Sequence, residues 1–308
     1  MRRADDGIAQ LRRRLAGLPA FAGRDLAALE VTPLPGLTNR SFLLRDGTER
    51  LVLRLAGAGS EAYVDRAAEA AAMAEAAALG LAPPVIAALP EEGLLLTRFL
   101  PGARPLAAAD LADPGLRAAA ARLLRRLHGS GIRLRHRRDL AATLAAYRRL
   151  AVERGQAEPA ALTEACAVAA PLLDALRGAA PAEVPCHIDP VPANFLLVPS
   201  PAPAGEGAGP RLYLIDWEYA SMCEPAWDLA DLAGEAGLDA AGRAALLAAY
   251  GAVPGDGLAE RVALLLPLLH LLAAAWAALQ RASGNPQGDF ADLVTARLAA
   301  FYAARPPP

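Results

Sequence analysis

The feature that most constrains the fold of this chain is a pair of β-hairpin signals that both lie before residue 100. The first joins two apolar runs, at 41–44 and 50–55, through Asp46-Gly47. An Asp-Gly pair between apolar runs is a strong indication of a tight hairpin turn. Two further apolar runs, at 85–89 and 93–99, predict a second hairpin. The beginning of the chain is therefore expected to form a small β-sheet.

Helices are expected between the two hairpins and throughout most of the later sequence. Residues 61–79 are rich in alanine and are followed by Gly80, a residue type that commonly ends helices. After Pro101-Gly102 the pattern is mostly helical, with two short apolar strands at 194–198 and 211–215. The composition therefore changes from β-rich to helical near residue 100.

This change predicts an α+β fold of two lobes. Residues 1–100 are expected to form the N-terminal lobe, with a short helix at 7–18, the sheet and one long helix. Residues 101–308 are expected to form a large, mostly helical C-terminal lobe. With 308 residues, 55% hydrophobic and 21% charged, the chain is long enough for two such lobes and too apolar for global disorder.

Charge argues against a nucleic-acid partner, cysteine content indicates the compartment, and hydropathy bears on membrane insertion. The 31 Lys+Arg and 33 Asp+Glu residues give a net charge of −2, whereas nucleic-acid-binding domains usually carry a basic excess. Three cysteines without a CxxC pair are typical of a reducing compartment, so we expect a cytoplasmic protein. The longest apolar run, 262–279, contains Pro267 and His270, so we interpret it as a buried helix rather than a membrane span. The oligomeric state stays open.

The most specific motif is His187-x-Asp189-x4-Asn194, which is followed later by Asp216 at the end of the apolar run 212–215. Hairpin pairing of that run with the strand after Asn194 would bring two carboxylates and one amide to one edge. Adjacent carboxylates repel each other unless a cation lies between them. Because Mg²⁺ prefers carboxylate and amide oxygens, the motif predicts a magnesium site.

The same motif resembles the catalytic loop and metal-binding residues of protein kinases and of their small-molecule relatives. Phosphoryl transfer needs positioning and charge neutralisation more than covalent chemistry from the protein. In kinases the loop aspartate orients a hydroxyl and accepts its proton, while the asparagine and the second aspartate hold metal on the nucleotide phosphates. The alternative is a helix cap next to a buried aspartate at a strand end.

The first lobe contains candidate nucleotide-binding residues at its ends. The turn with Thr38 and Asn39 can offer a hydroxyl and backbone N–H groups to phosphates, although an ordinary turn also explains its composition. The last strand ends near Phe99 and leads into the connection between the lobes, where backbone groups could bind adenine.

A second nucleotide-binding candidate is Arg54, a charged residue within an apolar strand. Kinases place a basic residue in this position to contact phosphates, and a desolvated guanidinium needs an acidic partner. We expect that partner to be Glu69 of the long helix, with Glu61 and Glu75 as rivals. The alternative is an edge-strand arginine that faces solvent.

The segments GLTNRSF, LVLRLAG, AYVDRAAE, HIDPVPANF and LIDWEYA together resemble the choline/ethanolamine kinase family, especially its bacterial choline kinase branch. That family belongs to the aminoglycoside-phosphotransferase-like group, and the similarity covers roughly residues 30 to 285. The resemblance implies a bilobal, protein-kinase-like fold with ATP and Mg²⁺ as cofactors. It also implies that Asp189 is the catalytic base and that Asn194 and Asp216 bind Mg²⁺.

The resemblance implies further roles close to the catalytic loop. Glu218 is a possible additional metal or water contact, and Asp228 is expected to support the loop without reacting. For His187 we expect a structural role through a hydrogen bond to the backbone, with direct proton transfer as the alternative.

The acceptor pocket is predicted from the same resemblance. Glu235 matches the acid that contacts the acceptor's cation, and Trp276 and Gln280 lie one helical turn apart, although Trp276 is also compatible with core packing. Ala236 and Ala273 stand where the family commonly has aromatic residues. Choline has no N–H donors and depends on aromatic faces. The two alanines therefore favour an acceptor that donates hydrogen bonds, such as ethanolamine, or a larger amino alcohol.

These expectations converge on an ATP- and Mg²⁺-dependent kinase that phosphorylates the hydroxyl of an amino alcohol, choline or ethanolamine. One alternative is the same chemistry on an aminoglycoside, thiamine, a sugar or an amino-acid alcohol. Another is a nucleotide-binding module without catalysis, which the presence of all three candidate catalytic residues disfavours.

Overall fold

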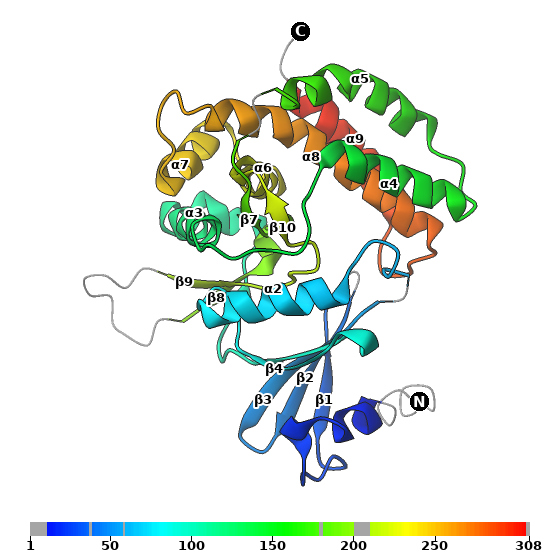
Figure 1. The fold of residues 1–308 in the computed structure, drawn as a ribbon, viewed down its shortest axis with the longest axis vertical. Coiled ribbons are helices and arrows are strands. Elements are labelled where there is room, and N and C mark those ends of the chain that lie inside the picture. The colour runs from blue at the N-terminus through cyan, green and yellow to red at the C-terminus, as the bar shows by residue number, and fades with distance from the viewer. Residues whose placement is uncertain (1–10, 37–38, 58, 179–180, 200–209, 306–308) are drawn as a thin grey trace. The chain divides into compact units, whose positions relative to one another are not determined.

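The structure is a computed structural model that divides into two compact units, Met1–Pro101 and Gly102–Pro308 (Figure 1). The division lies next to the boundary predicted at residue 100. The residues that the structure describes are 11–36, 39–57, 59–178, 181–199 and 210–305. Thr38, a candidate phosphate contact, lies outside these described residues.

The first unit is built on a five-stranded antiparallel sheet with the strand order β1-β2-β3-β5-β4. Its strands are β1 (Glu30–Leu34), β2 (Arg40–Asp46), β3 (Glu49–Leu55), β4 (Val85–Leu89) and β5 (Leu94–Arg98). Both predicted hairpins are present: β2 pairs with β3 around Asp46-Gly47, and β4 pairs with β5 across the short helix η2 (Pro90–Glu92).

The two faces of this sheet differ because side chains alternate along β3. Leu51, Leu53 and Leu55 are buried in a core that also contains Leu11 and Leu15 of the N-terminal helical segment. Arg54 points to the other face. There its side chain meets the helix α2 (Arg66–Ala78), which also packs against β4. The charged side chain of Arg54 is therefore accommodated on this face of the sheet by an acidic partner on α2.

The helix α2 begins later than the sequence pattern predicted. We expected it to span 61–79, but its first residue is Arg66. The side chain of Asp65 accepts hydrogen bonds from the backbone N–H groups of Ala67 and Ala68, both at 3.0 Å. An aspartate cap of this kind fixes a helix start, and alanine content alone does not reveal it.

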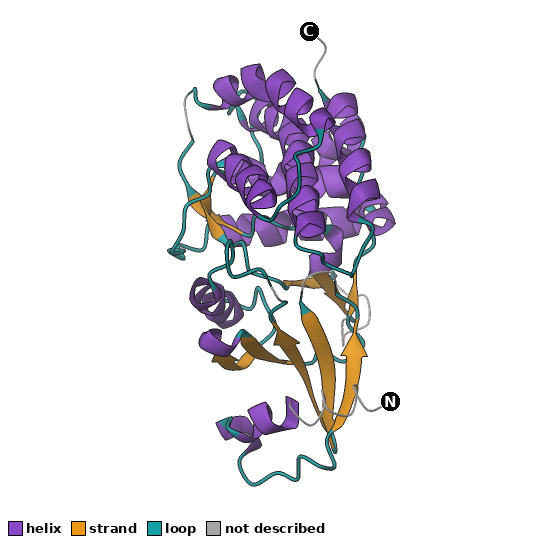
Figure 2. Cartoon of the chain, turned by 90° about the vertical axis from the view of Figure 1, so that its right-hand side faces the viewer, coloured by secondary structure: helices purple, strands orange, loops and turns teal. Residues whose placement is uncertain are grey.

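The second unit is mostly helical (Figure 2). Its helices are α3 (Pro114–His128), α4 (Leu140–Glu153), α5 (Ala160–Leu176), α6 (Pro225–Glu235), α7 (Ala240–Tyr250), α8 (Leu258–Ala282) and α9 (Phe290–Ala304). The helix α8 contacts α4, α5, α6 and α9. It contains the apolar run 262–279. By length and composition it could cross a membrane, yet 61% of its most apolar window is buried within the protein, as in a core helix.

Short strands frame the region in which the sequence predicted the catalytic loop. β6 (Arg104–Pro105), β8 (Phe195–Val198) and β9 (Arg211–Leu214) form one antiparallel sheet, and β7 (Val184–Cys186) pairs with β10 (Ser221–Cys223). The strands β8 and β9 were predicted. The strands β6, β7 and β10 were not, because two or three residues are too short to show a period.

The two hairpin turns of the first unit give a test of local packing. Gly47 and Gly93 both have positive φ angles, of 58° and 62°. A Cβ at Gly47 would meet nothing within 4 Å, whereas a Cβ at Gly93 would lie 2.6 Å from Cβ of Ala56. We expect Gly47→Ala to cost about 1 kcal/mol through its backbone conformation alone. Gly93→Ala should cost a further ~1–3 kcal/mol because of overpacking.

Urea unfolding of the two variants measures these losses as changes in the free energy of unfolding. Equal losses at the two positions would show that the contact with Ala56 is unimportant for stability.

Candidate active site

The hairpin of β8 and β9 brings two of the predicted functional residues to one end. Phe195 is paired with Leu214, and the backbone N–H of Ile215 donates to the carbonyl oxygen of Asn194 at 3.0 Å. Asn194 immediately precedes β8, and Asp216 follows β9 after one residue. The pairing register therefore places Asn194 and Asp216 at the same edge, as the sequence predicted.

Asn194 is tied to Asp189 by its side-chain amide. Its Nδ2 donates to the carbonyl oxygen of Asp189 at 2.9 Å and to Oδ2 of the same residue at 3.2 Å. These two bonds fix the orientation of the aspartate carboxylate. They also use the donor side of the amide, so its oxygen is the atom that can bind a metal ion.

The loop before Asp189 is held by Asp228, which is completely buried. Its Oδ2 accepts from the backbone N–H of His187 and its Oδ1 from that of Ile188, both at 2.8 Å. Nε2 of His128 lies 3.0 Å from Oδ2, and Nδ1 of the same ring lies 2.9 Å from the Tyr250 hydroxyl. Because a carboxylate only accepts, Nε2 of His128 donates to Asp228. Asp228 thus supports the loop, as the family resemblance implies.

The backbone at Ile188 is strained, which explains why it needs this support. Its φ angle is 75°, in the left-handed region that a β-branched residue rarely adopts. Its carbonyl oxygen accepts from Nε1 of Trp227 at 3.0 Å, while its N–H donates to Asp228. Hydrogen bonds on both sides of the residue hold the conformation that presents Asp189.

His187 links the catalytic loop to the strand that leads to Asp216. Its Nε2 donates to the carbonyl oxygen of Ile215 at 3.0 Å, and its ring packs edge-on against Trp217 with centroids 4.9 Å apart. Burial lowers the pKa of His187, which keeps the ring neutral. This geometry favours the structural role over direct proton transfer.

Several negative charges surround Asp189. Burial raises its pKa well above the ordinary value of an aspartate, and the charges of Asp216, Glu218 and Glu235 raise it further. The hydrogen bond from Asn194 acts in the opposite direction. A site that concentrates carboxylates in this way is suited to a bound cation.

The donors in this region fit Mg²⁺ on chemical grounds. Asp216 follows the strand with a φ angle of 64°, so its backbone is also in the left-handed region. Glu218 is only 8% exposed although it carries a carboxyl group. The amide oxygen of Asn194 and the carboxylates of Asp216 and Glu218 are all hard oxygen donors of the type that Mg²⁺ prefers. These three residues are therefore the candidate metal ligands.

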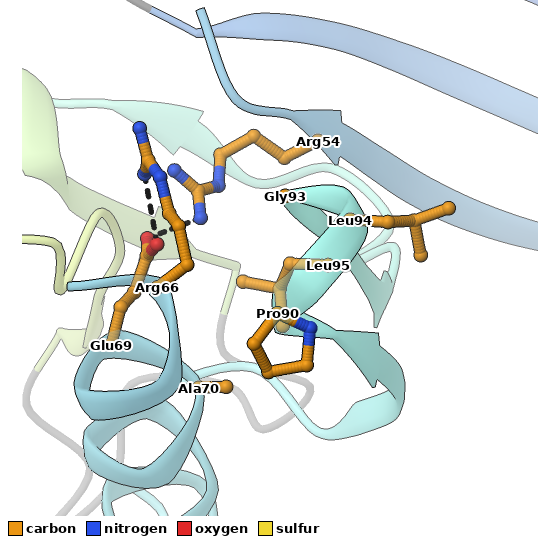
Figure 3. Close-up of a pocket in the computed structure, with 8 residues that line it drawn as sticks. All are labelled: Arg54, Arg66, Glu69, Ala70, Pro90, Gly93, Leu94 and Leu95. Carbon is orange, nitrogen blue, oxygen red and sulfur yellow. Dashed lines mark hydrogen bonds and ion pairs between the residues drawn. The ribbon is translucent and has the colours of Figure 1, made fainter. Parts of the chain in front are cut away.

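In the first unit, Arg54 and Glu69 form the ion pair that the sequence predicted (Figure 3). Glu69 is buried and Arg54 is largely buried, with side-chain exposures of 3% and 12%. Neither rival partner, Glu61 or Glu75, takes this place. A second arginine that we did not predict, Arg66, contacts the other oxygen of Glu69 at 2.9 Å. Its position three residues before Glu69 on α2 was the available signal.

Two other predicted nucleotide contacts already have partners within the first unit. Oδ1 of Asn39 accepts from the backbone N–H of Gly57 and from Nη2 of Arg66, both at 3.4 Å. The backbone N–H of Phe99 donates to the carbonyl oxygen of Arg50 at 3.2 Å. Of the backbone groups of Phe99, the carbonyl oxygen is therefore the one that could accept a hydrogen bond from adenine.

The predicted acceptor residues lie on α6 and α8, but protein groups contact all of them. Glu235 forms a two-bond ion pair with Arg297 of α9. Gln280 is buried and accepts from Nδ2 of Asn285 at 3.0 Å. Trp276 packs edge-on against Phe290, with ring centroids 5.8 Å apart. Of these partners, Arg297 gave no signal in the sequence, because it lies on a helix far along the chain from the catalytic motif.

Comparison with known proteins agrees with this geometry. Residues 30–265 match the family described as the phosphotransferase enzyme family. A crystal structure of a choline/ethanolamine kinase family protein from Mesorhizobium loti is 32% identical, with a TM-score of 0.80 over 97% of this chain and 95% of that one. The choline kinase LicA from Streptococcus pneumoniae has the same fold, with a TM-score of 0.79 at 23% identity, over 96% and 98% of the two chains. The predicted fold class is confirmed.

Protein LicA of Haemophilus influenzae is 28% identical over 228 residues. The match covers 72% of this chain and 63% of that protein, so this chain spans less than two thirds of its length.

The raised pKa of Asp189 leads to a prediction about stability. A carboxyl group whose pKa is higher in the folded state than in the unfolded state lowers stability as the pH rises from the unfolded pKa to the folded one. In the absence of divalent cations, Asp189→Asn should therefore be more stable than the wild type at neutral pH, by about 1.4 kcal/mol for each unit of pKa elevation. The difference should shrink as the pH falls toward the ordinary aspartate range.

Denaturant unfolding of both proteins across this pH range measures that difference. An advantage of the variant that grows on acidification would contradict the direction of the shift.

Proposed function

Because this chain belongs to the phosphotransferase enzyme family, we propose that it transfers the γ-phosphoryl group of ATP to the hydroxyl group of a small amino alcohol. Ethanolamine and choline are the first acceptors to test. The observation that carries the proposal is the hydrogen bond from Asn194 to Asp189, together with the hairpin that places Asp216 at the same edge as Asn194. We also propose a cytoplasmic location, where a small-molecule acceptor and ATP are both available.

In this proposal Asp189 orients the acceptor hydroxyl and accepts its proton. The amide of Asn194 donates to Oδ2 of Asp189, which fixes the carboxylate plane and leaves Oδ1 to accept from the hydroxyl. A carboxylate with a raised pKa is a stronger base than an ordinary aspartate, which suits proton transfer near neutral pH. Asp228 acts through the backbone of the loop and is a positioning residue.

The candidate ligands of Mg²⁺ in this proposal are Asn194, Asp216 and Glu218. When bound, the ion would neutralise charge on the phosphates of the nucleotide. Arg54 is proposed to contact the phosphates as well. Its guanidinium can do so because Glu69 fixes it within the first unit and Arg66 shares the charge of that glutamate.

The proposal predicts which residues are essential for turnover. Asp189→Ala and Asp216→Ala should each lower kcat by at least about 10³-fold, because each removes a group that acts on the reacting atoms or their charge. ADP release in the presence of Mg-ATP and a panel of amino alcohols, aminoglycosides, thiamine and sugars measures this turnover. Asp174→Asn, at an exposed position of α5, is the matched control and should have wild-type activity.

Retained turnover in either alanine variant would refute the catalytic roles. Turnover of the wild type only with acceptors that lack an amino group would refute the acceptor class.

The role of Arg54 can be tested separately through the KM for ATP. Arg54→Ala should raise the KM for ATP about 10- to 100-fold, which is the loss of a charged hydrogen bond, and should change the KM for the acceptor little. The control is Arg50→Ala, an exposed arginine on the same strand. An unchanged KM for ATP in the folded Arg54 variant would show that this arginine only balances the charge of Glu69.

A further inference from the structure

The acid predicted to contact the acceptor's cation, Glu235, already has a counter-ion within the protein. Both of its carboxylate oxygens accept from the guanidinium of Arg297, with Nη2 at 2.7 Å from Oε2. The side chains of this pair are only 23% and 18% exposed. An ammonium group that bound to Glu235 would therefore have to displace a two-bond interaction with arginine, which is among the strongest ion-pair geometries in proteins.

A second acid, Asp231, lies one helical turn before Glu235 on the same face of α6. Its Oδ2 is shielded from solvent and accepts no hydrogen bond from any group in the described part of the chain. No arginine or histidine of the described residues forms an ion pair with it. A shielded carboxylate oxygen without a hydrogen-bond donor is unfavourable, so the carboxylate of Asp231 is suited to a cationic ligand.

Asp231 belongs to the same electrostatic environment as the candidate base. Burial raises its pKa, and the charges of Glu235 and Asp189 raise it further. Arg297 acts in the opposite direction but less strongly. The carboxylates of Asp189, Asp231 and Glu235 thus belong to one electrostatic network. The guanidinium that lowers the pKa of Asp231, that of Arg297, is already bound to Glu235.

We propose that Asp231, rather than Glu235, is the carboxylate that binds the ammonium end of the acceptor, and that the acceptor's nitrogen carries N–H groups. The Arg297–Glu235 ion pair then acts as a positioning element that keeps Glu235 neutralised beside the bound cation. This inference rests on the proposed phosphotransferase function and names the substrate class more narrowly: a small alcohol with a primary or secondary amine.

The preference for N–H groups follows from the chemistry of the predicted acceptor residues. An ammonium N–H can donate to a carboxylate oxygen at about 2.7–2.9 Å. A trimethylammonium group cannot donate, and its methyl groups hold the charge farther away, so its binding depends on aromatic faces. The aromatic Trp276 is engaged with Phe290, and its Nε1 is shielded from solvent. Positions 236 and 273 are alanines and provide no aromatic face.

The test is a series of four acceptors that differ only in methylation: ethanolamine, its N-methyl and N,N-dimethyl derivatives, and choline. For the wild type we expect the KM to rise along the series. Asp231→Asn should raise the KM for ethanolamine about 10- to 100-fold, as expected for a lost charged hydrogen bond, while kcat changes much less. The variant should also lose most of the discrimination between ethanolamine and choline. Asn has nearly the shape of Asp, so this variant should fold.

The matched control is Asp292→Asn, the same substitution at an exposed position of α9, which should keep wild-type constants. An unchanged KM for ethanolamine in Asp231→Asn, or the same preference for ethanolamine over choline in variant and wild type, would overturn the proposal. A rise of KM in Glu235→Gln without any in Asp231→Asn would return the role to Glu235.

A binding measurement without ATP separates this inference from the proposed function. Ethanolamine should raise the Tm of the wild type more than 1-propanol, a neutral alcohol of similar size, and this difference should disappear in Asp231→Asn. If it appears while no acceptor is phosphorylated, the cation site stands and the proposed reaction fails. If acceptors are phosphorylated while Asp231→Asn binds and turns over ethanolamine like the wild type, the proposed reaction stands and the cation site is wrong.

Discussion

The site depends on one buried carboxylate that does not react. Asp228 has no exposed surface, and it accepts hydrogen bonds from two successive backbone N–H groups and from His128. These bonds stabilise the left-handed backbone of Ile188, the residue before the candidate base. A loop in this conformation would relax without such support, because a strained backbone persists only where fixed hydrogen-bond partners hold it. The helix α6, which carries Asp228, therefore determines where Asp189 points.

The charge distribution around Asp189 explains the chemistry proposed for the second unit. Burial raises the pKa of Asp189, and the charges of Asp216, Glu218 and Glu235 raise it further. The guanidinium of Arg297 is bound to Glu235, so the other carboxyl groups near Asp189 are left for ligands to balance. A divalent cation bound by Asn194 and Asp216 would balance part of this carboxylate charge. An ammonium group bound to Asp231 would balance another part. The surplus of carboxylates is a reason for binding cationic ligands and a cost to stability without them.

The sequence predicted those features that depend on spacing along one segment. The two hairpins and the strand-end position of Asp216 followed from apolar runs and turn residues. The partner of Arg54 was expected because a buried guanidinium needs an acid on the neighbouring helix, and Glu69 is that acid. The pairs that join distant helices could not be predicted. Neither Arg297 with Glu235 nor His128 with Asp228 has a local pattern, because each depends on how helices pack. The late start of α2 was missed because the cap at Asp65 outweighed the alanine pattern.

The most direct test of the central claim identifies the product of the reaction. Phosphorus NMR of the wild-type protein with Mg-ATP and ethanolamine should show the γ-phosphate signal replaced by that of a phosphomonoester, in equal amount to the ADP formed. Formation of ADP with inorganic phosphate alone, or an unchanged ATP spectrum with every amino alcohol, would contradict the account of Asp189 as the residue that prepares an acceptor hydroxyl.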